Sequence, residues 1–458
     1  MIAEVIVDIA HSEVDKIFDY ACDDSIEAGM RVAVPFNKSA ATGFVVRVKE
    51  HTDCPPEKLK RVFRAEEDFP AITKECLALA HKIAERYRCP LAASLRLFLP
   101  AEMRTGKVGE VYISYARLSA GEVSVSPRAK QQAALLDYLK ECGEAESTLL
   151  REKFGAGAYR SLVEKGVILE EKRRRYRAPY SGVAGENILR TLTPQQKAAI
   201  SSVRATDKTV TLLHGVTGSG KTEIYLNLIA EELSAGRSAI FLVPEISLTP
   251  QMLAQLRARF GRSCAILHSG LSAGERFDEW MRLREGEARI AIGARSAVFA
   301  PVENIGVIII DEEHDGSYSS ESAPRYNTFD IALLRARHNG CKLLLGSATP
   351  SVETYRRAKT GEFNLITLSE RINARPMPSV SIVDMRREVR RGNPSAFSNV
   401  LKEKLERCLA EGNQAILFLN RRGYSQTVIC RDCGYVANCV NCDVSLTYHS
   451  EENCLKCH

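Results

Sequence analysis

The sequence has none of the features that mark a membrane or secreted protein. No apolar run in its 458 residues approaches the roughly 20 residues that a membrane helix needs. The first residues, MIAEVIVDIAHSEVDK, lack the basic head and the long apolar stretch of a signal peptide. Both absences lead us to expect a cytoplasmic protein.

The chain also has little excess charge. Its 63 Lys and Arg residues face 57 Asp and Glu residues. On so long a chain, the net charge of +6 does not by itself indicate nucleic-acid binding. Such binding must depend on where the cations lie. With 45% apolar residues, a chain of this length has room for about three domains, each with its own core.

Cysteine is sparse until the end of the chain. Of the 14 cysteines, eight are scattered between Cys22 and Cys408, as small buried residues would be. The other six form three CxxC pairs, at Cys430, Cys433, Cys439, Cys442, Cys454 and Cys457. In a reducing compartment such crowding favours a metal over disulfides. Because a tetrahedral Zn²⁺ takes two such pairs, three pairs make one site and half of another.

The first part of the chain predicts two small domains. Short β-rich runs such as EVIVDIA and MRVAVPF lead into a helical stretch, which indicates a β-rich domain with a helical end. Three short helices and the basic, hairpin-like segment LEEKRRRYRAPY then outline a winged helix. This segment carries five cations around Tyr176, namely Lys172, Arg173, Arg174, Arg175 and Arg177. An isolated run of this kind is usually a solvated turn, but beside a winged helix it favours contact with a nucleic-acid backbone.

After residue 190 the pattern changes to strand, helix, strand, helix. Near-continuous apolar runs such as TVTLLH, AIFLVP, GVIIID and KLLLGS alternate with amphipathic helices. This alternation predicts an α/β fold with a parallel sheet covered by helices on both faces. Ligands of such sheets bind at the carboxyl ends of the strands.

A phosphate-binding loop follows the first of these strands. The segment GVTGSGKT, residues 215–222, matches GxxxxGK[ST] in the required strand-to-helix context. Backbone amides can turn towards phosphate oxygens because of its glycines, Gly215, Gly218 and Gly220. Lys221 is expected to reach the outer phosphates and Thr222 to ligate Mg²⁺. The alternative, a glycine-rich turn without function, is disfavoured by this context.

An acidic motif, VIIIDEEHD, places carboxylates directly after another apolar strand. Asp311 is expected to hold the Mg²⁺, and Glu312 to orient or deprotonate a water that attacks the terminal phosphate. The two motifs together predict nucleoside-triphosphate hydrolysis, with Lys221, Asp311 and Glu312 as the catalytic residues.

The remaining motifs resemble, in their order, those of superfamily 2 helicases. They are LTPQQ (192–196), LVPEISLTPQ (242–251), HSG at 268, GARSAVFAP (293–301), DEEH (311–314) and GSATPS (346–351). With FDY near the start and FLNRRGYS before the cysteines, the whole chain is similar to the bacterial primosomal protein N′ (PriA) family of replication-restart helicases. This resemblance implies a cytoplasmic bacterial enzyme that uses ATP to unwind DNA from 3′ to 5′, recognises branched forks and initiates primosome assembly.

The resemblance also implies the domain organisation. The expected parts are a β-rich domain that binds a DNA 3′ end (1–105), a winged helix (120–182), a RecA-like ATP-binding lobe (188–370), a linker with the start of a second lobe (371–428) and part of a zinc-binding region (429–458). In the first lobe Gln196 would contact adenine. The residues expected to couple the nucleotide to the grip on DNA are Glu313, His314, Ser347 and Thr349.

DNA contacts are implied in two places. The lobe and the winged helix would use the PEIS segment at Pro244 and Glu245, together with Arg295, Ser296, Tyr318, Tyr326, Arg173, Arg174 and Arg175. In the first domain, KIFDY matches a pocket for the 3′ end of a nascent leading strand. Phe18 would stack on the base and Asp19 would accept a hydrogen bond from the terminal hydroxyl, with Tyr20 beside them and Lys60 at the rim.

Two positions depart from the family pattern. Asn37 replaces a common glycine; asparagine tolerates a left-handed backbone but adds bulk, which predicts a narrower pocket. In the aromatic-rich loop after DEEH, Tyr318, Arg325 and Tyr326 are kept, but Asn327 stands where a histidine is frequent.

In the family, four CxxC pairs bind two zinc ions, the outer pairs sharing one and the inner pairs the other. On this scheme Cys439, Cys442, Cys454 and Cys457 form a complete site, whereas Cys430 and Cys433 need ligands that would follow His458, with His458 itself as an alternative ligand. The chain therefore resembles a truncated family member without the late arginines that complete the ATPase site.

Two other functions stay open from the sequence. One is a different superfamily 2 translocase, and the other, for a truncated chain, is a non-catalytic module for fork binding or primosome assembly. By resemblance, the cofactors are ATP, Mg²⁺ and Zn²⁺. The expected partners are forked and single-stranded DNA, single-strand-binding protein and other primosome proteins.

Overall fold

The computed structural model describes the chain except for residues 10–13, 107, 120–128, 178–190, 373–377, 394, 419–427, 429, 431–432, 434, 450–453 and 458. The described residues form two compact units, Met1–Ala374 and Arg375–His458. Among the described helices, none is both long and apolar enough to cross a membrane.

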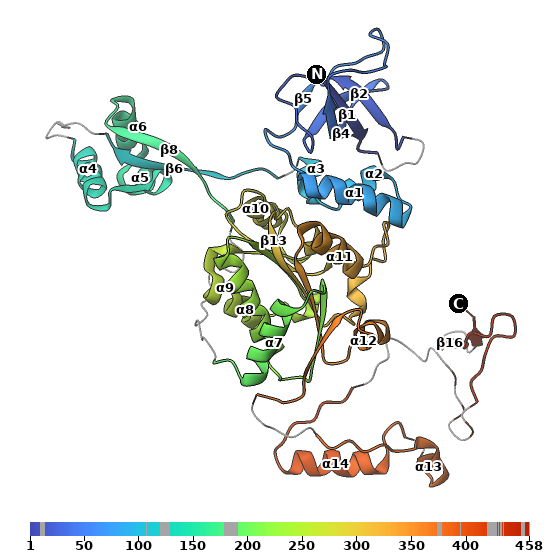
Figure 1. Cartoon of the computed structure of the whole chain (residues 1–458). Helices are drawn as coiled ribbons and strands as arrows, with labels where there is room; N and C mark the ends of the chain where they lie inside the picture. The colour runs from blue at the N-terminus through green and yellow to red at the C-terminus, as the bar shows by residue number, and fades with distance from the viewer. Residues whose placement is uncertain are drawn as a thin grey trace. The chain divides into compact units, whose positions relative to one another are not determined.

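The chain begins with an antiparallel sheet in the order β2-β1-β4-β3-β5 (Figure 1). Its strands are β1 Ile2–Val7, β2 Ile17–Ala21, β3 Arg31–Phe36, β4 Ser39–Lys49 and β5 Arg64–Ala65. β-branched side chains suit such a surface, and Val5, Val32 and Val45 pack together in its core. The hairpin between β3 and β4 turns at Asn37, whose φ is 51°. The β-rich start predicted from the sequence is confirmed.

Three helices follow, α1 Lys74–Tyr87, α2 Leu91–Arg96 and α3 Ala101–Thr105. Helix α1 begins after Thr73, whose side chain accepts a hydrogen bond from the backbone N–H of Cys76 and so caps the helix. Apolar residues of these helices share one core with α10 Ala273–Arg284 and α11 Thr328–Asn339 of the following lobe. The pair between Arg335 of α11 and Glu75 of α1, 2.8 Å apart and buried, lies at this junction.

The next part combines three helices with a three-stranded sheet, as in a winged helix. Its elements are β6 Tyr112–Leu118, α4 Lys130–Cys142, β7 Glu144–Glu146, α5 Ser147–Phe154, α6 Ala156–Glu164 and β8 Ile168–Arg174, with the strand order β7-β6-β8. The prediction of a basic hairpin is wrong. The basic segment forms β8, which pairs with β6 from Ile168 opposite Leu118 to Arg174 opposite Tyr112. Its partner strand thus precedes the helices, and residues 178–180 of the segment lie outside the described residues.

A parallel sheet in the order β11-β12-β10-β13-β14-β9-β15 forms the centre of the first unit (Figure 1). The strands are β9 Val210–Gly215, β10 Ser238–Leu242, β11 Cys264–Leu267, β12 Ile290–Gly293, β13 Ile305–Asp311, β14 Lys342–Ser347 and β15 Asn364–Leu368. Successive residues alternate between two cores: Ile308 and Leu343 belong to one, Ile309 and Leu344 to the other. Both faces are therefore buried, which explains the near-continuous apolar runs.

Helices cover both faces of this sheet. On one face, α10 and α11 contribute Trp280 and Ile331 to the core. On the other face lie α7 Pro194–Ala205, α8 Lys221–Ser234 and α9 Pro250–Phe260, and α8 contributes Ile224. Helix α12, Val352–Lys359, follows β14. This arrangement confirms the predicted RecA-like α/β lobe, and because its strands are parallel, the loops after β9, β13 and β14 share one edge.

In the second unit the structure describes α13 Met385–Arg390, α14 Asn399–Ala410 and the hairpin of β16 Thr447–His449 with β17 Cys454–Lys456. Its described residues include no parallel sheet. The apolar side chains of Ile416, Leu417 and Phe418 are exposed, and residues 419–425 of the FLNRRGYS motif lie outside the described residues. The start of a second lobe stays a prediction.

Candidate active site

Residues 216–220 join β9 to α8 at the carboxyl edge of the parallel sheet. Gly218 and Gly220 have φ angles of 83° and 80°, which glycine adopts at no steric cost. Lys221, the first residue of α8, is buried and its Nζ donates a hydrogen bond to the carbonyl oxygen of Gly215 at 2.9 Å. The loop thus offers a cation and the N-terminus of a helix to an incoming phosphate. Thr222, the next residue, is half-buried.

Gln196 supports this loop from α7. Its Oε1 accepts a hydrogen bond from the backbone N–H of Thr193, and its Nε2 donates to the carbonyl oxygen of Gly220 at 3.2 Å. The residue is only 2% exposed. Both ends of the amide are therefore used within the protein, and a contact between Gln196 and adenine stays a prediction.

The segment that leaves the sheet after β15 returns to the same loop. The backbone N–H of Ile372 donates to the carbonyl oxygen of Gly218 at 3.1 Å. A Cβ on Gly220 would lie 2.6 Å from Cδ1 of Ile372, so glycine is needed here for close approach. Within the described part of the chain, the buried Nε of Arg371 has no hydrogen-bond partner. The sequence motifs did not single out this cation.

Asp311 ends β13, next to β14 and one strand further from β9. Its Oδ1 accepts a hydrogen bond from the hydroxyl of Tyr225 at 2.9 Å, and its backbone carbonyl accepts one from Tyr318 at 2.7 Å. Burial raises the pKa of the Asp311 carboxyl, against the opposing influence of the Tyr225 hydrogen bond and the Lys221 charge. Carboxylate oxygen is a ligand that Mg²⁺ prefers, so the donor set of Asp311 and Thr222 fits this ion.

The residues after Asp311 connect β13 with β14. Glu312 has a φ of 46°, which is uncommon for residues other than glycine, and its carboxylate lies 3.7 Å from Nδ1 of His314. Nδ1 of His314 also shares a hydrogen bond with Oγ of Ser347 at 2.8 Å, and Nε2 lies 3.3 Å from Oγ1 of Thr349. Three of the predicted coupling residues therefore form one bridge between the two strands.

Glu313, the fourth predicted coupling residue, contacts the beginning of α12 instead. Its carboxylate accepts hydrogen bonds from the backbone N–H of Ser351 at 2.7 Å and from the hydroxyl of Thr354 at 3.0 Å. A carboxylate at the beginning of a helix is favourable because it meets the unpaired N–H groups and the positive end of the helix dipole. Glu313 thus fixes the start of α12 to the end of β13.

The predicted DNA-contact residues of the lobe differ in exposure. Arg295 is half-buried and donates to the carbonyl oxygen of Ser319 at 2.6 Å, whereas Ser296 is exposed. Tyr318 and Tyr326 are buried, and Tyr326 packs edge-to-face on Phe299 with ring centroids 4.9 Å apart. In this structure the two tyrosines therefore support the loop from inside, and a contact of their rings with DNA stays a prediction.

The loop contains two further residues named from the sequence. Arg325 is exposed. The side chain of Asn327 accepts a hydrogen bond from the backbone N–H of Phe329 at 2.8 Å and caps α11. Asparagine at this departure from the family pattern is thus a helix-capping residue. In the PEIS segment, Pro244 precedes a short 3₁₀ helix, Glu245–Ser247, and the exposed Glu245 accepts a hydrogen bond from Ser269.

The FDY segment lies on β2 of the first sheet. Phe18 is half-buried and contacts Phe36 edge-to-face, with centroids 5.5 Å apart. Asp19 pairs with Lys49 at 2.9 Å. Tyr20 is buried and donates to the carbonyl oxygen of Pro35 at 3.3 Å. Phe18 and Asp19 are therefore the members of this motif that retain exposed surface.

Two other residues named from the sequence frame this segment. Lys60 is exposed, and its carbonyl oxygen accepts a hydrogen bond from the backbone of Ala21 at the end of β2. Asn37, also exposed, occupies the left-handed turn after Phe36. Asn37 therefore follows Phe36, the ring partner of Phe18, and Lys60 contacts the end of β2. The 3′-end pocket itself stays a prediction.

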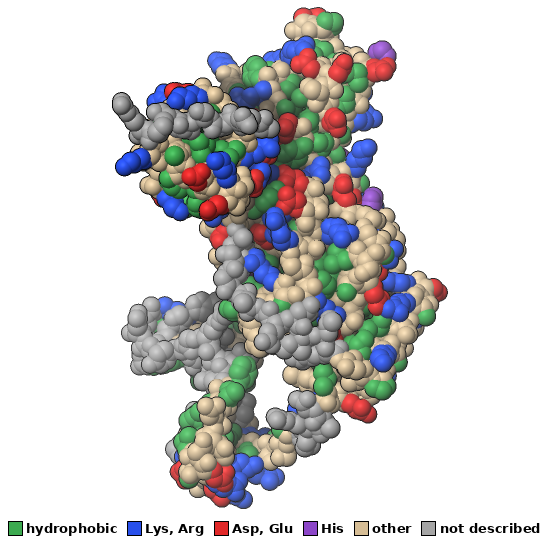
Figure 2. Space-filling view, turned by 90° about the vertical axis from the view of Figure 1, so that its left-hand side faces the viewer, with side chains coloured by type: hydrophobic (Ala, Val, Ile, Leu, Met, Phe, Trp, Pro, Cys, Tyr) green, Lys and Arg blue, Asp and Glu red, His purple; other side chains and the backbone are tan. Residues whose placement is uncertain are grey.

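Most cations of the basic segment 172–177, which comprises the end of β8 and the residues after it, already have carboxylate partners. Arg173 pairs with Glu144 at 2.6 Å, and Arg174, whose side chain is 14% exposed, pairs with Glu110 at 2.9 Å. Arg175 is different, because its side chain is 65% exposed and its nearest carboxylate oxygen, in Glu146, is 3.9 Å away. Figure 2 likewise shows Lys and Arg side chains interspersed with Asp and Glu on the face that it draws.

The other two cations of the segment, Lys172 and Arg177, also differ in exposure and pairing. Lys172 is exposed. Arg177 contacts the buried Asp278 at 3.3 Å. Among the described residues of the segment 172–177, the cations therefore do not form a continuous unpaired strip, and their contact with a nucleic-acid backbone stays a prediction.

The structure brings three of the C-terminal cysteines together. The sulfur atoms of Cys439, Cys442 and Cys457 lie within 4.8 Å of one another. Hydrogen bonds from backbone N–H groups, chiefly that of Asn441, lower the pKa of Cys439 and so favour the thiolate that binds metals. This donor set fits a tetrahedral metal ion such as Zn²⁺ with one further ligand.

The other predicted ligands are outside this group. Cys454 lies on β17 opposite His449. In the part of the chain that the structure describes, neither Cys454 nor the pair Cys430 and Cys433 joins the three clustered sulfur atoms. His458 lies outside the described residues. The complete four-cysteine site therefore stays a prediction.

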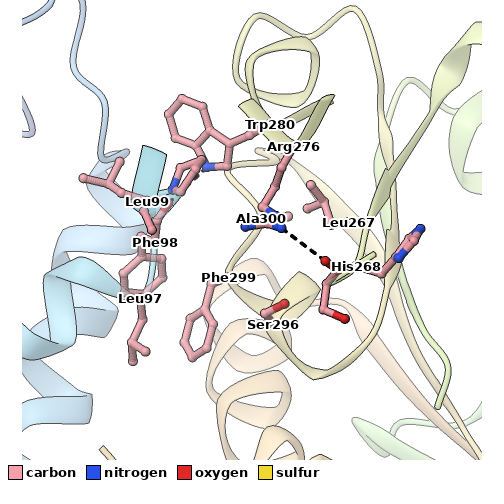
Figure 3. A pocket seen from close by; sticks show the side chains of 13 residues that line it. Leu97, Phe98, Leu99, Leu267, His268, Arg276, Trp280, Ser296, Phe299 and Ala300 are labelled. Carbon is pink, nitrogen blue, oxygen red and sulfur yellow. Dashed lines mark hydrogen bonds between the residues drawn. The ribbon is translucent and has the colours of Figure 1, made fainter. Parts of the chain in front are cut away.

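A pocket of about 330 Å³ marks the junction between the α2–α3 segment and the lobe (Figure 3). Figure 3 shows Phe98 and Leu99 on one side and Trp280, Phe299 and Ser296 on the other. The indole N–H of Trp280 donates to the carbonyl oxygen of Phe98 at 3.1 Å. The segment that carries the predicted DNA-facing Ser296 is thus packed directly against the first domain's helical end.

Sequence reasoning missed Tyr225, Arg335 and Arg371. Tyr225 lies one helical turn after Lys221, and this spacing is the only signal that could have pointed to it. Arg335 reads as an ordinary helix residue, because its carboxylate partner Glu75 is 260 positions away. Long-range pairs of this kind leave no local pattern.

Two family comparisons match separate parts of the chain. The 3′DNA-binding domain of PriA matches residues 4–100. The DEAD/DEAH box helicase family matches residues 193–358. Among solved structures, RecG bound to a three-way DNA junction is similar with a TM-score of 0.31 and 24% identity, over 45% of this chain and 29% of that chain.

Several curated proteins are similar along nearly the whole chain. The replication restart protein PriA of Bacillus subtilis (strain 168) is 39% identical over 100% of this chain and 66% of its own length. Its namesake from Synechocystis sp. is 33% identical over 100% of this chain and 66% of the relative. The one from Haemophilus influenzae is 35% identical over 97% and 62%. The chain spans about two thirds of the length of these relatives, and it belongs to the PriA family of replication-restart helicases.

Proposed function

We propose that this chain is an ATP-dependent DNA helicase that moves from 3′ to 5′, recognises stalled or branched replication forks and initiates primosome assembly. The observation that carries the proposal is the shared edge of the parallel sheet. There Lys221 begins α8 after β9, Asp311 ends β13 and Ser347 ends β14, and these three strands are neighbours in the sheet. The residues that would bind a nucleotide, Lys221 and Asp311, thus lie at the same edge of the sheet as Ser347, a residue that would couple nucleotide binding to DNA binding.

Nucleotide binding would begin at the loop after β9. Lys221 would exchange its hydrogen bond to the Gly215 carbonyl for one to the outer phosphates, while loop amides and the helix N-terminus bind phosphate oxygens. Thr222 and Asp311 are the proposed Mg²⁺ ligands, and the ion supplies charge neutralisation on the phosphates when bound. Glu312 would orient or deprotonate the attacking water. Arg371 adds a cation beside the same loop.

Coupling to DNA would pass through the bridge between β13 and β14. His314 touches Glu312, Ser347 and Thr349, so a shift of Glu312 on loss of the terminal phosphate would be felt by the motif after β14. Arg295 and Ser296, at the same edge of the sheet, would bind the DNA backbone. This proposal is supported by the contacts of His314 with Glu312, Ser347 and Thr349.

Fork recognition is proposed for the first domain. Phe18 would stack on the base of a 3′-terminal nucleotide, and Asp19 would exchange part of its contact with Lys49 for the terminal hydroxyl. The name of the family that matches residues 4–100, a 3′DNA-binding domain, supports this role. Single-strand-binding protein and other primosome proteins are the proposed protein partners, with Zn²⁺ held by the clustered cysteines.

The test is ATP hydrolysis by the 458-residue chain with and without forked DNA. We expect fork-stimulated turnover that Lys221→Ala abolishes, because the ammonium group meets the charge of the outer phosphates. Lys197→Ala is the matched control, since Lys197 is an exposed lysine on α7. Strand displacement on duplexes with either a 3′ or a 5′ tail then tests the direction.

A second candidate is a non-catalytic module that binds forks. It is supported by the match of residues 4–100 to a 3′DNA-binding domain. Fork binding without turnover in a folded chain would support this candidate and contradict the helicase.

A further inference from the structure

Tyr225 joins the two nucleotide motifs through a single buried hydroxyl group. It lies on α8, four residues after Lys221, and is fully buried. Its hydroxyl donates to Oδ1 of Asp311 at 2.9 Å. One helix thus supplies both the phosphate-binding cation and a contact to the carboxylate on β13.

This contact depends on a glycine in the neighbouring strand. Gly346 of β14 lies directly opposite Asp311 in the parallel pairing. A Cβ on Gly346 would lie 1.6 Å from the Tyr225 hydroxyl oxygen and 3.1 Å from Oδ1 of Asp311. Real atoms never approach so closely, so only glycine leaves room for the hydrogen bond. Gly346, the glycine of the GSATPS motif, is therefore needed to leave space for the Tyr225 hydroxyl beside Asp311.

The ring of Tyr225 is itself held in place. It packs edge-to-face on Phe241 of β10, with centroids 5.6 Å apart, in the core on that side of the sheet. A buried aromatic ring in a close-packed core has few alternative positions. The hydroxyl is consequently a fixed donor, and it fixes one of the two carboxylate oxygens of Asp311.

We propose that Tyr225 is a positioning residue that orients Asp311 for the divalent cation of the bound nucleotide, with Gly346 providing the space for it. The inference rests on the proposed nucleotide function. Because Tyr225 holds Oδ1 of Asp311, the carboxylate is restricted to one orientation, and its Oδ2 is the oxygen that would bind the cation. Partners that orient a metal ligand typically contribute about 10-fold or more to metal affinity.

The experiment measures binding of a fluorescent ATP analogue by anisotropy in the 458-residue chain, at increasing Mg²⁺ and separately in EDTA. For Tyr225→Phe, which keeps the ring and removes the hydroxyl, we expect the Mg²⁺ concentration for half-maximal binding to rise about 10-fold. Affinity in EDTA should change by less than about twofold, because Lys221 and the loop are untouched. A purely structural role would weaken both equally.

Tyr159→Phe is the matched control. Tyr159 is a buried tyrosine whose hydroxyl also meets a carboxylate, Glu170 at 2.6 Å, but it belongs to the winged helix. Its Mg²⁺ dependence should equal that of the wild type. Gly346→Ala should reproduce the Tyr225→Phe effect, and the double variant should cost less than the sum, because without the hydroxyl the added methyl group meets a smaller obstacle.

Two results would overturn the inference. An unchanged Mg²⁺ dependence of folded Tyr225→Phe, with folding checked by circular dichroism, would remove Tyr225 from the cation site. Equal losses with Mg²⁺ and in EDTA would assign it a structural role only. Failure of the wild-type chain to bind the nucleotide at any Mg²⁺ concentration would instead overturn the proposed function, and this inference with it.

Discussion

The nucleotide edge of the parallel sheet and the cysteine segment 430–457 both present candidate ion ligands, but different forces hold those ligands in place. Lys221 is buried and Asp311 is half-buried, and both are hydrogen-bonded to the protein, on strands and helices that share two apolar cores. Cys442 and Cys457 are exposed and flank a short hairpin, in a segment without such a core among its described residues. A large core can position ligands before the ion arrives, whereas a small segment depends on the ion for its structure.

Metal removal should give the largest effect, and it tests most directly whether the cysteine segment depends on an ion for its structure. We expect the chain to carry zinc, and Cys442→Ser to lose it, since one ligand of a clustered site is gone. Chelation should increase protease cleavage within 430–457 while the melting of the first unit stays unchanged, because the ion organises only the segment.

Zinc content by colorimetric assay and limited proteolysis provide the measurements. Cys142→Ser is the control, since Cys142 is an exposed cysteine on α4 of the first unit and is not one of the clustered cysteines. A zinc-free chain with the same proteolysis pattern would show that the segment needs no ion.

Within the first unit, the buried pair of Arg335 and Glu75 should give the next largest effect. Arg335 is fully buried, pairs with Glu75 at 2.8 Å and donates to the carbonyl oxygens of Val298 and Ala300. Arg335→Met leaves Glu75 buried without its partner, which typically costs about 3–5 kcal/mol of unfolding free energy. Urea denaturation measures the loss.

Arg337→Met on the same helix is the control, because Arg337 is exposed and its loss should cost less than about 0.5 kcal/mol. The double variant with Glu75→Gln should recover part of the loss, because no buried charge remains. Equal effects at positions 335 and 337 would contradict the importance of the buried pair.

The last residue of β8, Arg174, and the residue after it, Arg175, offer a smaller contrast between a paired and an exposed cation. Arg175→Ala should lower the salt dependence of DNA affinity by about one unit of slope, since an exposed cation can release a counterion from the backbone. Arg174→Ala should leave that slope unchanged, because Arg174 is already paired with Glu110. Fluorescence anisotropy at several salt concentrations checks both, and equal slopes for the two variants would contradict the distinction.

The smallest expected effect concerns pH and the first sheet. Hydrogen bonds from Arg47, and next from Lys49, lower the pKa of Glu4 from 4.5 to about 2. Because the folded pKa is lower than the unfolded one, this contribution to stability is complete above pH 4.5 and is lost as the pH falls towards 2.

Glu4→Gln should therefore reduce the difference in melting temperature between pH 6 and pH 3. Glu50→Gln, at an exposed position just after β4, is the control. If both variants keep the wild-type difference, Glu4 is not the origin of this acid sensitivity.

Local patterns were enough to predict the parts of the fold that local chemistry decides. The alternation of apolar strands and helices predicted the parallel sheet, and GVTGSGKT predicted the loop between β9 and α8 that the structure confirms. The basic segment shows the limit of such patterns. Its residues read as a hairpin, but β8 pairs with β6, more than 50 positions earlier, and no local signal records that partner.

The aromatic-rich loop teaches the same lesson about side chains. Resemblance placed Tyr318 and Tyr326 on the DNA, since aromatic rings in a loop suit base stacking. In the structure both are buried, and Tyr318 donates to the backbone of Asp311. Whether a ring faces solvent or a core depends on the elements that surround the loop, which one segment of sequence does not contain.

By itself, the sequence determined the chemistry that this protein carries. The loop glycines, Lys221, the acids after β13 and the CxxC pairs are recognisable because their spacing is local. Which side chains contact each other depends on the tertiary structure. It brings Tyr225 to Asp311 beside Gly346, His314 to Ser347, and Arg335 to Glu75. These contacts join strands and helices that are far apart in the chain, and burying apolar surface from all of them in common cores is the force that brings them together.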